Sequence, residues 1–222
     1  MKAGEEVFIK VDQTLTHDIN AVMTYLAFEA IGLDRIRTEC SVSYLDHNLL
    51  YVDHKTPDDH IYLQSAAEHF GVHVSRPGNG ICHAVQVSRF GAPGKVSMGG
   101  DSIHLTAFYW YAVYRCRWYG CCNSHDRRSY ASENAKSHQS QPDRRFKAGV
   151  NAKEVILEML RRVTIKGGLG NVYEYAGPGA ATLEVPQRAT ITNMGAELGA
   201  TTSIFPADEQ VRKFYEVPGK RR

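Results

Sequence analysis

The sequence predicts a three-layered α/β protein with a doubly wound first domain and the start of a second domain near residue 137. Short apolar runs alternate with amphipathic helical segments over residues 1–102, and this alternation returns over residues 149–205. Polar residues directly follow several of the runs. Strands that alternate with helices form mostly parallel sheets, whose sites gather at the carboxyl ends of the strands. We therefore expect the polar residues at those ends to form the functional site.

In the first segment we expect strands over residues 7–11, 41–45 and 72–74. A helix over residues 19–31 is predicted from apolar residues at helical spacing, namely Ile19, Val22, Met23, Leu26 and Ala30. A second helix should begin with Asp58 or Asp59 as its cap and end at Phe70. Gly32 and Gly71 are well placed to end the two helices.

The third segment is equally regular. Asn151 should cap a helix over residues 152–163, whose apolar face is Val155, Ile156, Met159, Leu160 and Val163. Glycine-rich turns flank an expected strand over residues 172–175; they lack the GxxxxGK[ST] pattern and are interpreted as tight turns. Residues 189–192 resemble a further strand end, and residues 208–222 a solvated tail.

The composition is that of a globular protein, and it argues against nucleic acid and membranes as partners. The chain has 222 residues, 43% of them hydrophobic, and 26 Lys and Arg against 24 Asp and Glu give a formal net charge of +2. A dedicated nucleic-acid binder would carry a strong basic excess. A membrane span would need about 18 consecutive apolar residues, and no window of the sequence approaches that. The first twelve residues contain no apolar stretch typical of a secretory signal, so we expect a cytoplasmic protein.

The candidate site residues stand at the ends of the predicted strands. Asp46 and His47 follow the strand over residues 41–45, and a histidine beside a carboxylate exchanges protons near neutral pH. A plain polar loop is the alternative interpretation. His83 lies between apolar neighbours, as a core histidine would. Asp101 and Ser102 follow another strand-like run.

Residues 103–146 match neither neighbouring segment. Both tryptophans, four of the twelve tyrosines and three of the five cysteines lie between residues 109 and 122. The spacing of Cys116, Cys121, Cys122 and His125 is not the CxxC spacing of structural zinc sites, and we do not expect a metal there.

Taken together, several strings resemble the aconitase and isopropylmalate-isomerase family of iron–sulfur dehydratases, most of all its aconitate hydratase branch. They occur in family order over about three quarters of the chain. The strings are DQTLT (12–16), VSYLDHN (42–48), RPGNGICH (76–83), GGDS (99–102), GVNAKEVI (149–156), KGGLGNVYEYAGPG (166–179) and TNMGAELGATTSIFP (192–206).

The resemblance implies an aconitase-like three-layer α/β/α fold and roles for individual residues. Asp46 and His47 match the pair that handles the departing hydroxyl, and His83 and Asp101 match a second such pair. Ser102 matches a residue that contacts substrate. Asn193 and Glu197 match residues close to the cluster and its bound water. The reaction implied is citrate to isocitrate through cis-aconitate, in which a [4Fe–4S] cluster binds the hydroxyl that leaves.

The chain departs from the family pattern in four ways. The three cysteines that bind the cluster in the family have no match here, and neither Cys40 nor Cys82 corresponds to one, so no metal ligand is expected. The family's base serine and substrate arginines are also missing. A glutamine that contacts substrate is replaced by His17, a doubtful substrate ligand. The DSHT motif reads DSIHLT, which displaces its histidine to position 104.

Our hypothesis for the middle segment is a shift of reading frame. Trp110 and Trp118 each have the single codon TGG, and loss of its first base makes a glycine codon of each. With suitable synonymous codons, the shifted frame of residues 109–145 can then encode the apolar, glycine-rich stretch that the family carries here. We expect residues 1–136 to form the first domain, with about 103–145 out of frame, and residues 137–222 to begin the second.

The predicted function is that of an iron–sulfur hydro-lyase acting on a small tricarboxylate or 2-hydroxy acid. Isomerisation of isopropylmalate or homoaconitate is an alternative within the family. A second alternative is an inactive, truncated or frameshifted fragment, or one that needs the remaining half of the enzyme as a separate chain. A zinc-binding or basic interaction module on residues 116–128 is a remote third.

Overall fold

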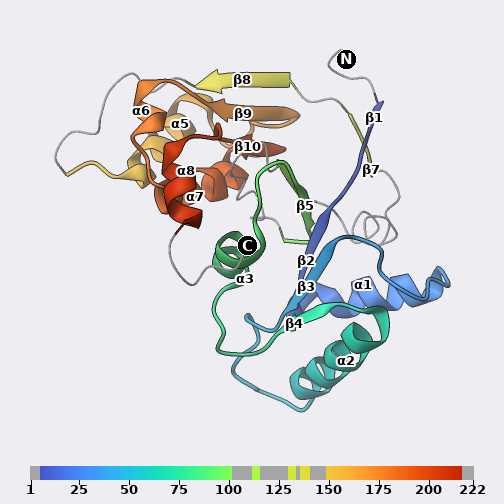
Figure 1. Ribbon diagram of the computed structural model, residues 1–222. Helices are drawn as coiled ribbons and strands as arrows, with labels where there is room; N and C mark the ends of the chain where they lie inside the picture. The colour runs from blue at the N-terminus through green and yellow to red at the C-terminus, as the bar shows by residue number, and fades with distance from the viewer. Residues whose placement is uncertain (1–5, 102–111, 116–129, 134–135, 141–148, 217–222) are drawn as a thin grey trace.

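The computed structural model describes residues 6–101, 112–115, 130–133, 136–140 and 149–216 (Figure 1). Its main sheet has five strands, all parallel, in the order β4-β3-β2-β5-β6. The strands are β2 (Gln13–His17), β3 (Cys40–Tyr44), β4 (His73–Ser75), β5 (Val96–Gly99) and β6 (Ala112–Arg115). The chain runs outward from β2 to β4 and then returns to β5 on the other side of β2. This reversal confirms the α/β, doubly wound prediction, and it places a topological switch point between β2 and β5.

Two helical layers cover the faces of this sheet. Helices α1 (Asp18–Ala30) and α2 (Lys55–Phe70) share a core that includes Tyr25, Phe28 and Leu63. On the other face, Leu15, Val42 and Tyr44 pack with Cys82 of α3 (Cys82–Val85), which continues into η1 (Gln86–Phe90). Gln86 fastens this layer to the sheet, because its Nε2 donates to Gln13 Oε1 and its Oε1 accepts from the Tyr44 hydroxyl. The segment after β3 is thereby held close to α3.

The predicted apolar face of α1 is wrong. Ile19, Met23 and Leu26 are exposed, whereas Ala21, Tyr25 and Phe28 are buried. The buried set also has helical spacing, and it contains the two aromatic rings, which remove the most apolar surface from water.

Helix α2 begins earlier than predicted. Its first residue is Lys55, and neither Asp58 nor Asp59 caps it. Pro57 is tolerated because it lies in the first turn, where its missing N–H has no partner to lose. The predicted end is confirmed: Gly71 has φ 79°, a left-handed conformation that suits glycine, and it closes the helix.

A second, smaller parallel sheet has the order β10-β9-β8. Its strands are β8 (Lys136–Ser140), β9 (Asn171–Tyr175) and β10 (Thr202–Ile204), and helix α5 (Ala152–Val163) packs on it with α7 (Val185–Asn193). Asn151 caps α5 as predicted, and the predicted apolar face of α5 packs into this core. The short α6 (Pro178–Ala181), η2 (Met194–Leu198) and α8 (Glu209–Tyr215) complete this part.

Three other expectations need correction. Residues 189–192 are helical rather than a strand end, since the Glu184 capping box and Pro186 in the first turn begin α7 before them. Part of the expected tail forms α8, whose Val211 is buried. Strand β2 was not expected from the sequence, and β1 (Glu6–Ile9) pairs antiparallel with β7 (Tyr130–Glu133) outside the main sheet.

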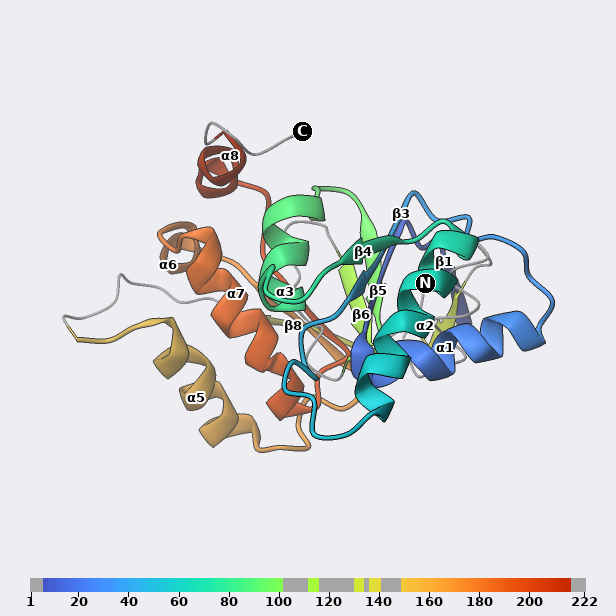
Figure 2. The same ribbon diagram turned by 90° about the horizontal axis from the view of Figure 1, so that it is seen from below.

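The two parts of the chain touch through α3, η1 and the C-terminal helices. Figure 2 shows α3 between α7 and the strands of the main sheet. Val87, Val185 and Val211 form a small apolar core there, and the Tyr215 hydroxyl donates to the carbonyl of Val87. His83, on α3, therefore lies near this junction.

Much of the middle segment lies outside the described residues, and with it the proposed frameshift, His104 and the Cys116–His125 cluster. The domain division at residues 136/137 stays a prediction. Within the described part of the chain, no helix is long and apolar enough to span a bilayer.

Candidate active site

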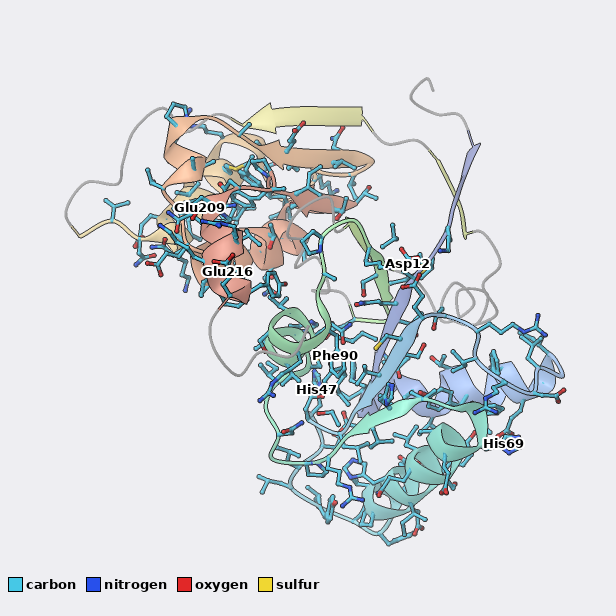
Figure 3. All side chains as sticks on the ribbon, in the orientation of Figure 1. Asp12, His47, His69, Phe90, Glu209 and Glu216 are labelled. Atoms are coloured by element: carbon cyan, nitrogen blue, oxygen red, sulfur yellow. The ribbon has the colours of Figure 1, made fainter. Side chains whose placement is uncertain are left out.

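The predicted site residues meet at the carboxyl ends of the strands beside the switch point. His17 is the last residue of β2, Asp46 and His47 follow β3, and Asp101 follows β5. His83 reaches them from α3. Figure 3 shows His47 beneath α3 in that view, beyond the end of the sheet. Five of the predicted residues are thus close neighbours in space, although up to 84 positions separate them in sequence.

Asp46 orients the imidazole of His47. His47 Nδ1 lies 2.9 Å from Asp46 Oδ1, and because a carboxylate only accepts, the proton of this bond belongs to Nδ1. The second carboxylate oxygen accepts the backbone N–H of Cys82 at 2.6 Å, so Asp46 is itself fixed. His47 Nε2, whose lone pair this tautomer leaves available, faces Asp101 Oδ2 at 3.9 Å. A side chain arranged in this way can take up or release a proton at Nε2.

Asp101 is the centre of the group. His83 Nε2 lies 2.9 Å from Asp101 Oδ2 and donates to it, while the Nε2 atoms of His17 and His47 are 3.7 and 3.9 Å from the same oxygen. The His17, His83 and Asp101 side chains are no more than 13% exposed, whereas His47 retains 28%. Three imidazoles therefore surround one carboxylate oxygen, and His47 is the one open to solvent.

His17 belongs to the site, and the structure reduces its basicity. Its ring stacks on His47 with centroids 4.2 Å apart. Its Nδ1 accepts the N–H of Ile19, and its Nε2 lies 3.0 Å from Asn20 Nδ2. Burial, and then the nearby His47, lower the pKa of His17. His17 is accordingly held neutral beside its stacked partner.

Two members of the site, Asp18 and His60, were not expected from the sequence. Asp18 is the first residue of α1, and its side chain is completely buried. It accepts the backbone N–H groups of His47 and Asn48 and lies 3.2 Å from His60 Nε2. An acidic residue directly after a strand, at the start of a helix, was the available signal.

The remaining predicted residues are less closely connected. Asn193 and His83 both line a mostly apolar cavity of about 560 Å³ between α3 and α7. Glu197 lies in η2 and, among the described residues, makes no hydrogen bond or ion pair with the histidine–aspartate group. Ser102 lies outside the described residues.

Among the described residues, three sets of side chains have ligand atoms close enough to share a metal ion. The first is His17, Asp18 and His47, the second Asp46, His47 and Cys82, and the third Cys82, His83 and Asp101, with all ligand atoms of a set within 4.8 Å of one another. The second and third sets depend on the Cys82 thiol. Burial raises the pKa of that thiol, as do the nearby carboxylates of Asp46 and Asp101, so Cys82 is held as a protonated thiol.

Comparison with known proteins shows which family the sequence of this chain resembles. The model of the aconitase family (aconitate hydratase) matches residues 132–222. A protein of Schizosaccharomyces pombe named as a fusion of aconitase and a ribosomal protein is 31% identical over 225 residues, which cover 91% of this chain. The chain therefore contains an aconitase family domain.

Other relatives in the family carry different substrate names. A mitochondrial homocitrate dehydratase of Saccharomyces cerevisiae is 29% identical over 99% of this chain. A 3-isopropylmalate dehydratase large subunit of Archaeoglobus fulgidus is 27% identical over 98% of it. The chain spans 23%, 29% and 53% of the lengths of these three relatives.

The expected cytoplasmic location is contradicted by these comparisons. The homocitrate dehydratase and the putative aconitate hydratases of Aspergillus fumigatus and Emericella nidulans are named mitochondrial. The expectation rested on the missing apolar stretch of a secretory signal, and organelle-targeting leaders are amphipathic instead.

The described residues do not fit the [4Fe–4S] cluster implied by the family resemblance. Such clusters are held by several cysteine thiolates. The described part of the chain offers two cysteines, Cys40 and Cys82, and burial raises the pKa of both thiols. Both side chains pack into an apolar cluster with Leu15 and Val42.

Proposed function

We propose that this chain supplies the proton-handling part of an aconitase-type hydro-lyase site. The observation that carries the proposal is the convergence of two imidazole–carboxylate pairs, Asp46–His47 and His83–Asp101, each joined at 2.9 Å. A hydro-lyase must protonate a hydroxyl as it leaves carbon, and a histidine held by a carboxylate is suited to that transfer.

In this proposal His47 carries the transferred proton. Protonated His47 gives its Nε2 proton to the departing hydroxyl, which leaves as water, and Asp46 stabilises the imidazolium through Nδ1. The reverse transfer accompanies hydration. His83 stays bonded to Asp101 and fixes the carboxylate opposite His47, so the negative charge lies where the imidazolium forms. His17 lies beside the ring without competing for its proton, because its own pKa is lowered.

The substrate class is a small hydroxy acid with several carboxylates. Citrate, homocitrate and 3-isopropylmalate are alternatives of equal standing, because the relatives bear names from all three branches. The residues that would recognise the distinguishing substituent are not among the described groups of the site.

In our proposal, the complete activity requires more polypeptide than this chain. The chain spans about a quarter of the length of its fungal relatives, and the described residues offer neither a cluster ligand set nor the family's base serine. The inactive fragment remains the alternative proposal for the chain by itself. A separate chain that contributes the rest of the site is compatible with the proton-handling role.

Citrate titration followed by imidazole nitrogen NMR tests the proposal on the chain itself. Citrate should shift the His47 and His83 resonances and leave those of His73, an exposed residue of β4, unchanged. His47→Asn should weaken binding, and His73→Asn, the matched control, should not. Equal shifts at all three histidines, or no shift at His47, would exclude the proposed site.

Turnover separates the enzyme from the fragment alternative. The purified chain, reconstituted anaerobically with iron and sulfide, would be assayed for hydration of cis-aconitate. Activity of the chain without a partner overturns the inactive-fragment alternative. If the chain is inactive, the same assay with the candidate second chain present tests whether the site is shared.

A further inference from the structure

Asp18 is a buried charge that the proton-transfer steps above do not use. Its side chain is fully buried, yet it lies where three hydrogen-bond donors surround it. Asn48 N–H donates to Oδ2 at 2.8 Å, His47 N–H is 3.2 Å from both oxygens, and His60 Nε2 is 3.2 Å from Oδ2. Asp18 is also the first residue of α1, a helix of 13 residues, and the amino end of a helix favours a carboxylate in its first turn. A buried carboxylate persists only with such compensation.

The contacts extend outward through His60 to Tyr51. Because the carboxylate of Asp18 only accepts, His60 must carry a proton on Nε2. His60 Nδ1 is then an acceptor when the ring is neutral, and the Tyr51 hydroxyl, 3.1 Å away, donates to it. Tyr51 lies in the segment that follows His47 and Asn48, so this chain of bonds returns to the same loop. The loop is tied at both its beginning and its exposed middle.

Asp18 also faces the stacked imidazoles from the side opposite Asp101. Asp18 Oδ1 lies 3.7 Å from His47 Nδ1 and 3.9 Å from His17 Nδ1. Asp101 Oδ2 approaches the Nε2 atoms of the same rings. The two rings are therefore held between two carboxylates, and the backbone of His47 is fixed by one of them.

We propose that Asp18 is the positioning residue of the site: it fixes the loop that carries His47, so that His47 Nε2 points toward Asp101. His60 and Tyr51 hold the Asp18 carboxylate in turn. The catalytic consequence rests on the proposed function, whereas the positioning itself concerns only this chain. A purely structural role at the start of α1 would affect the stability of the protein but not the ring of His47.

Three variants separate the two roles. Asp18→Asn keeps the shape of the side chain but places an NH₂ group where donors converge. Tyr51→Phe removes only the outermost hydroxyl, from a side chain that is 55% exposed. The matched control is Asp53→Asn, since Asp53 also accepts two backbone N–H groups, those of Lys55 and Thr56, but is exposed and outside the site.

The readouts are amide hydrogen exchange at Asn48 and the imidazole nitrogen spectrum of His47. In Asp18→Asn we expect Asn48 exchange to accelerate about tenfold or more and the His47 resonances to move; each tenfold change corresponds to about 1.4 kcal/mol. Tyr51→Phe should shift the Nδ1 resonance of His60 and accelerate Asn48 exchange to a smaller extent. Asp53→Asn should change neither readout.

A folded Asp18→Asn protein with unchanged Asn48 exchange and an unchanged His47 spectrum would overturn the proposal. If Asp18→Asn does not fold, Tyr51→Phe and His60→Gln decide: unchanged Asn48 exchange in both also overturns it. Absence of citrate binding would contradict the proposed function while leaving these readouts intact. In a polypeptide that turns over, we expect Asp18→Asn to lower kcat by about 10²-fold with little change in KM, as for a misplacement of about 1 Å.

Discussion

Replacement of Gly100 by alanine tests how tightly the residue after β5 is packed against Asn20, whose side chain contacts His17. A Cβ atom at Gly100 would lie 2.6 Å from Asn20 Nδ2, whereas ordinary van der Waals contact begins at 3.4 Å. The amide of Asn20 would have to retreat by roughly 0.8 Å. It would then lose its contact with His17 Nε2 and its bond from the His17 N–H, which are now 3.0 and 3.1 Å long.

The expected cost combines overpacking with the loss of a helix cap. Overpacking costs about 1–3 kcal/mol, and loss of a capping interaction costs about 1 kcal/mol. We therefore expect Gly100→Ala to lower the free energy of unfolding by about 2–4 kcal/mol in urea titration. Asn20→Ala removes the obstructing amide, so the double variant should be little less stable than Asn20→Ala alone.

The double-mutant cycle decides whether this reasoning is correct. A coupling energy of about 1 kcal/mol or more is expected, since the two side chains compete for one space. If the two costs add within about 0.5 kcal/mol, the close approach of Gly100 to Asn20 does not exist and the account of β5 fails.

Three further predictions concern the core and its charges. Phe28→Ala should destabilise the protein by about 3–5 kcal/mol in urea titration, whereas Leu26→Ala on the exposed side of α1 should destabilise it much less. Equal losses of stability would mean that α1 buries the apolar face predicted from the sequence. Arg188 is fully buried and bonded to three carbonyl oxygens and to Asp208. Arg188→Met should lower the free energy of unfolding by about 3–5 kcal/mol in the same titration, and Arg161→Met, at an exposed position, is the control. A loss of stability no larger than that of the control would refute this prediction. The lowered pKa of His17 favours its neutral form in the fold, so stability should be complete above the unfolded value near 6.5 and fall as the pH drops toward the folded pKa. Urea titrations from pH 5 to 8 should show a shallower pH dependence for His17→Gln, and an unchanged slope would contradict this.

Local sequence signals predicted those features that depend on neighbouring residues. The Asn151 cap and the apolar face of α5 were correct because spacing and capping act within a few positions. The face of α1 was not, because two apolar patterns share that helix and the tertiary core buries the one that contains Tyr25 and Phe28. Residues 189–192 illustrate the same limit: their β-branched side chains favour a strand, but the capping box and core contacts make them helical.

The site was predictable as a set of strand ends but not as a geometry. His17 was doubtful from the sequence, yet its ring lies on that of His47. Asp18 and His60 were missed because their importance depends on a burial and a contact across 42 positions. The stacked rings and the shared oxygen of Asp101 depend on strand order, which a single sequence does not reveal.

The tautomers of His47 and His83 test the central claim most directly. Imidazole nitrogen NMR at a pH where both rings are neutral should find the His47 proton on Nδ1, bonded to Asp46, and the His83 proton on Nε2, bonded to Asp101. Added citrate should then perturb His47 Nε2 more than its Nδ1. A His47 proton on Nε2, with no response to citrate at that nitrogen, would contradict the proposed proton transfer.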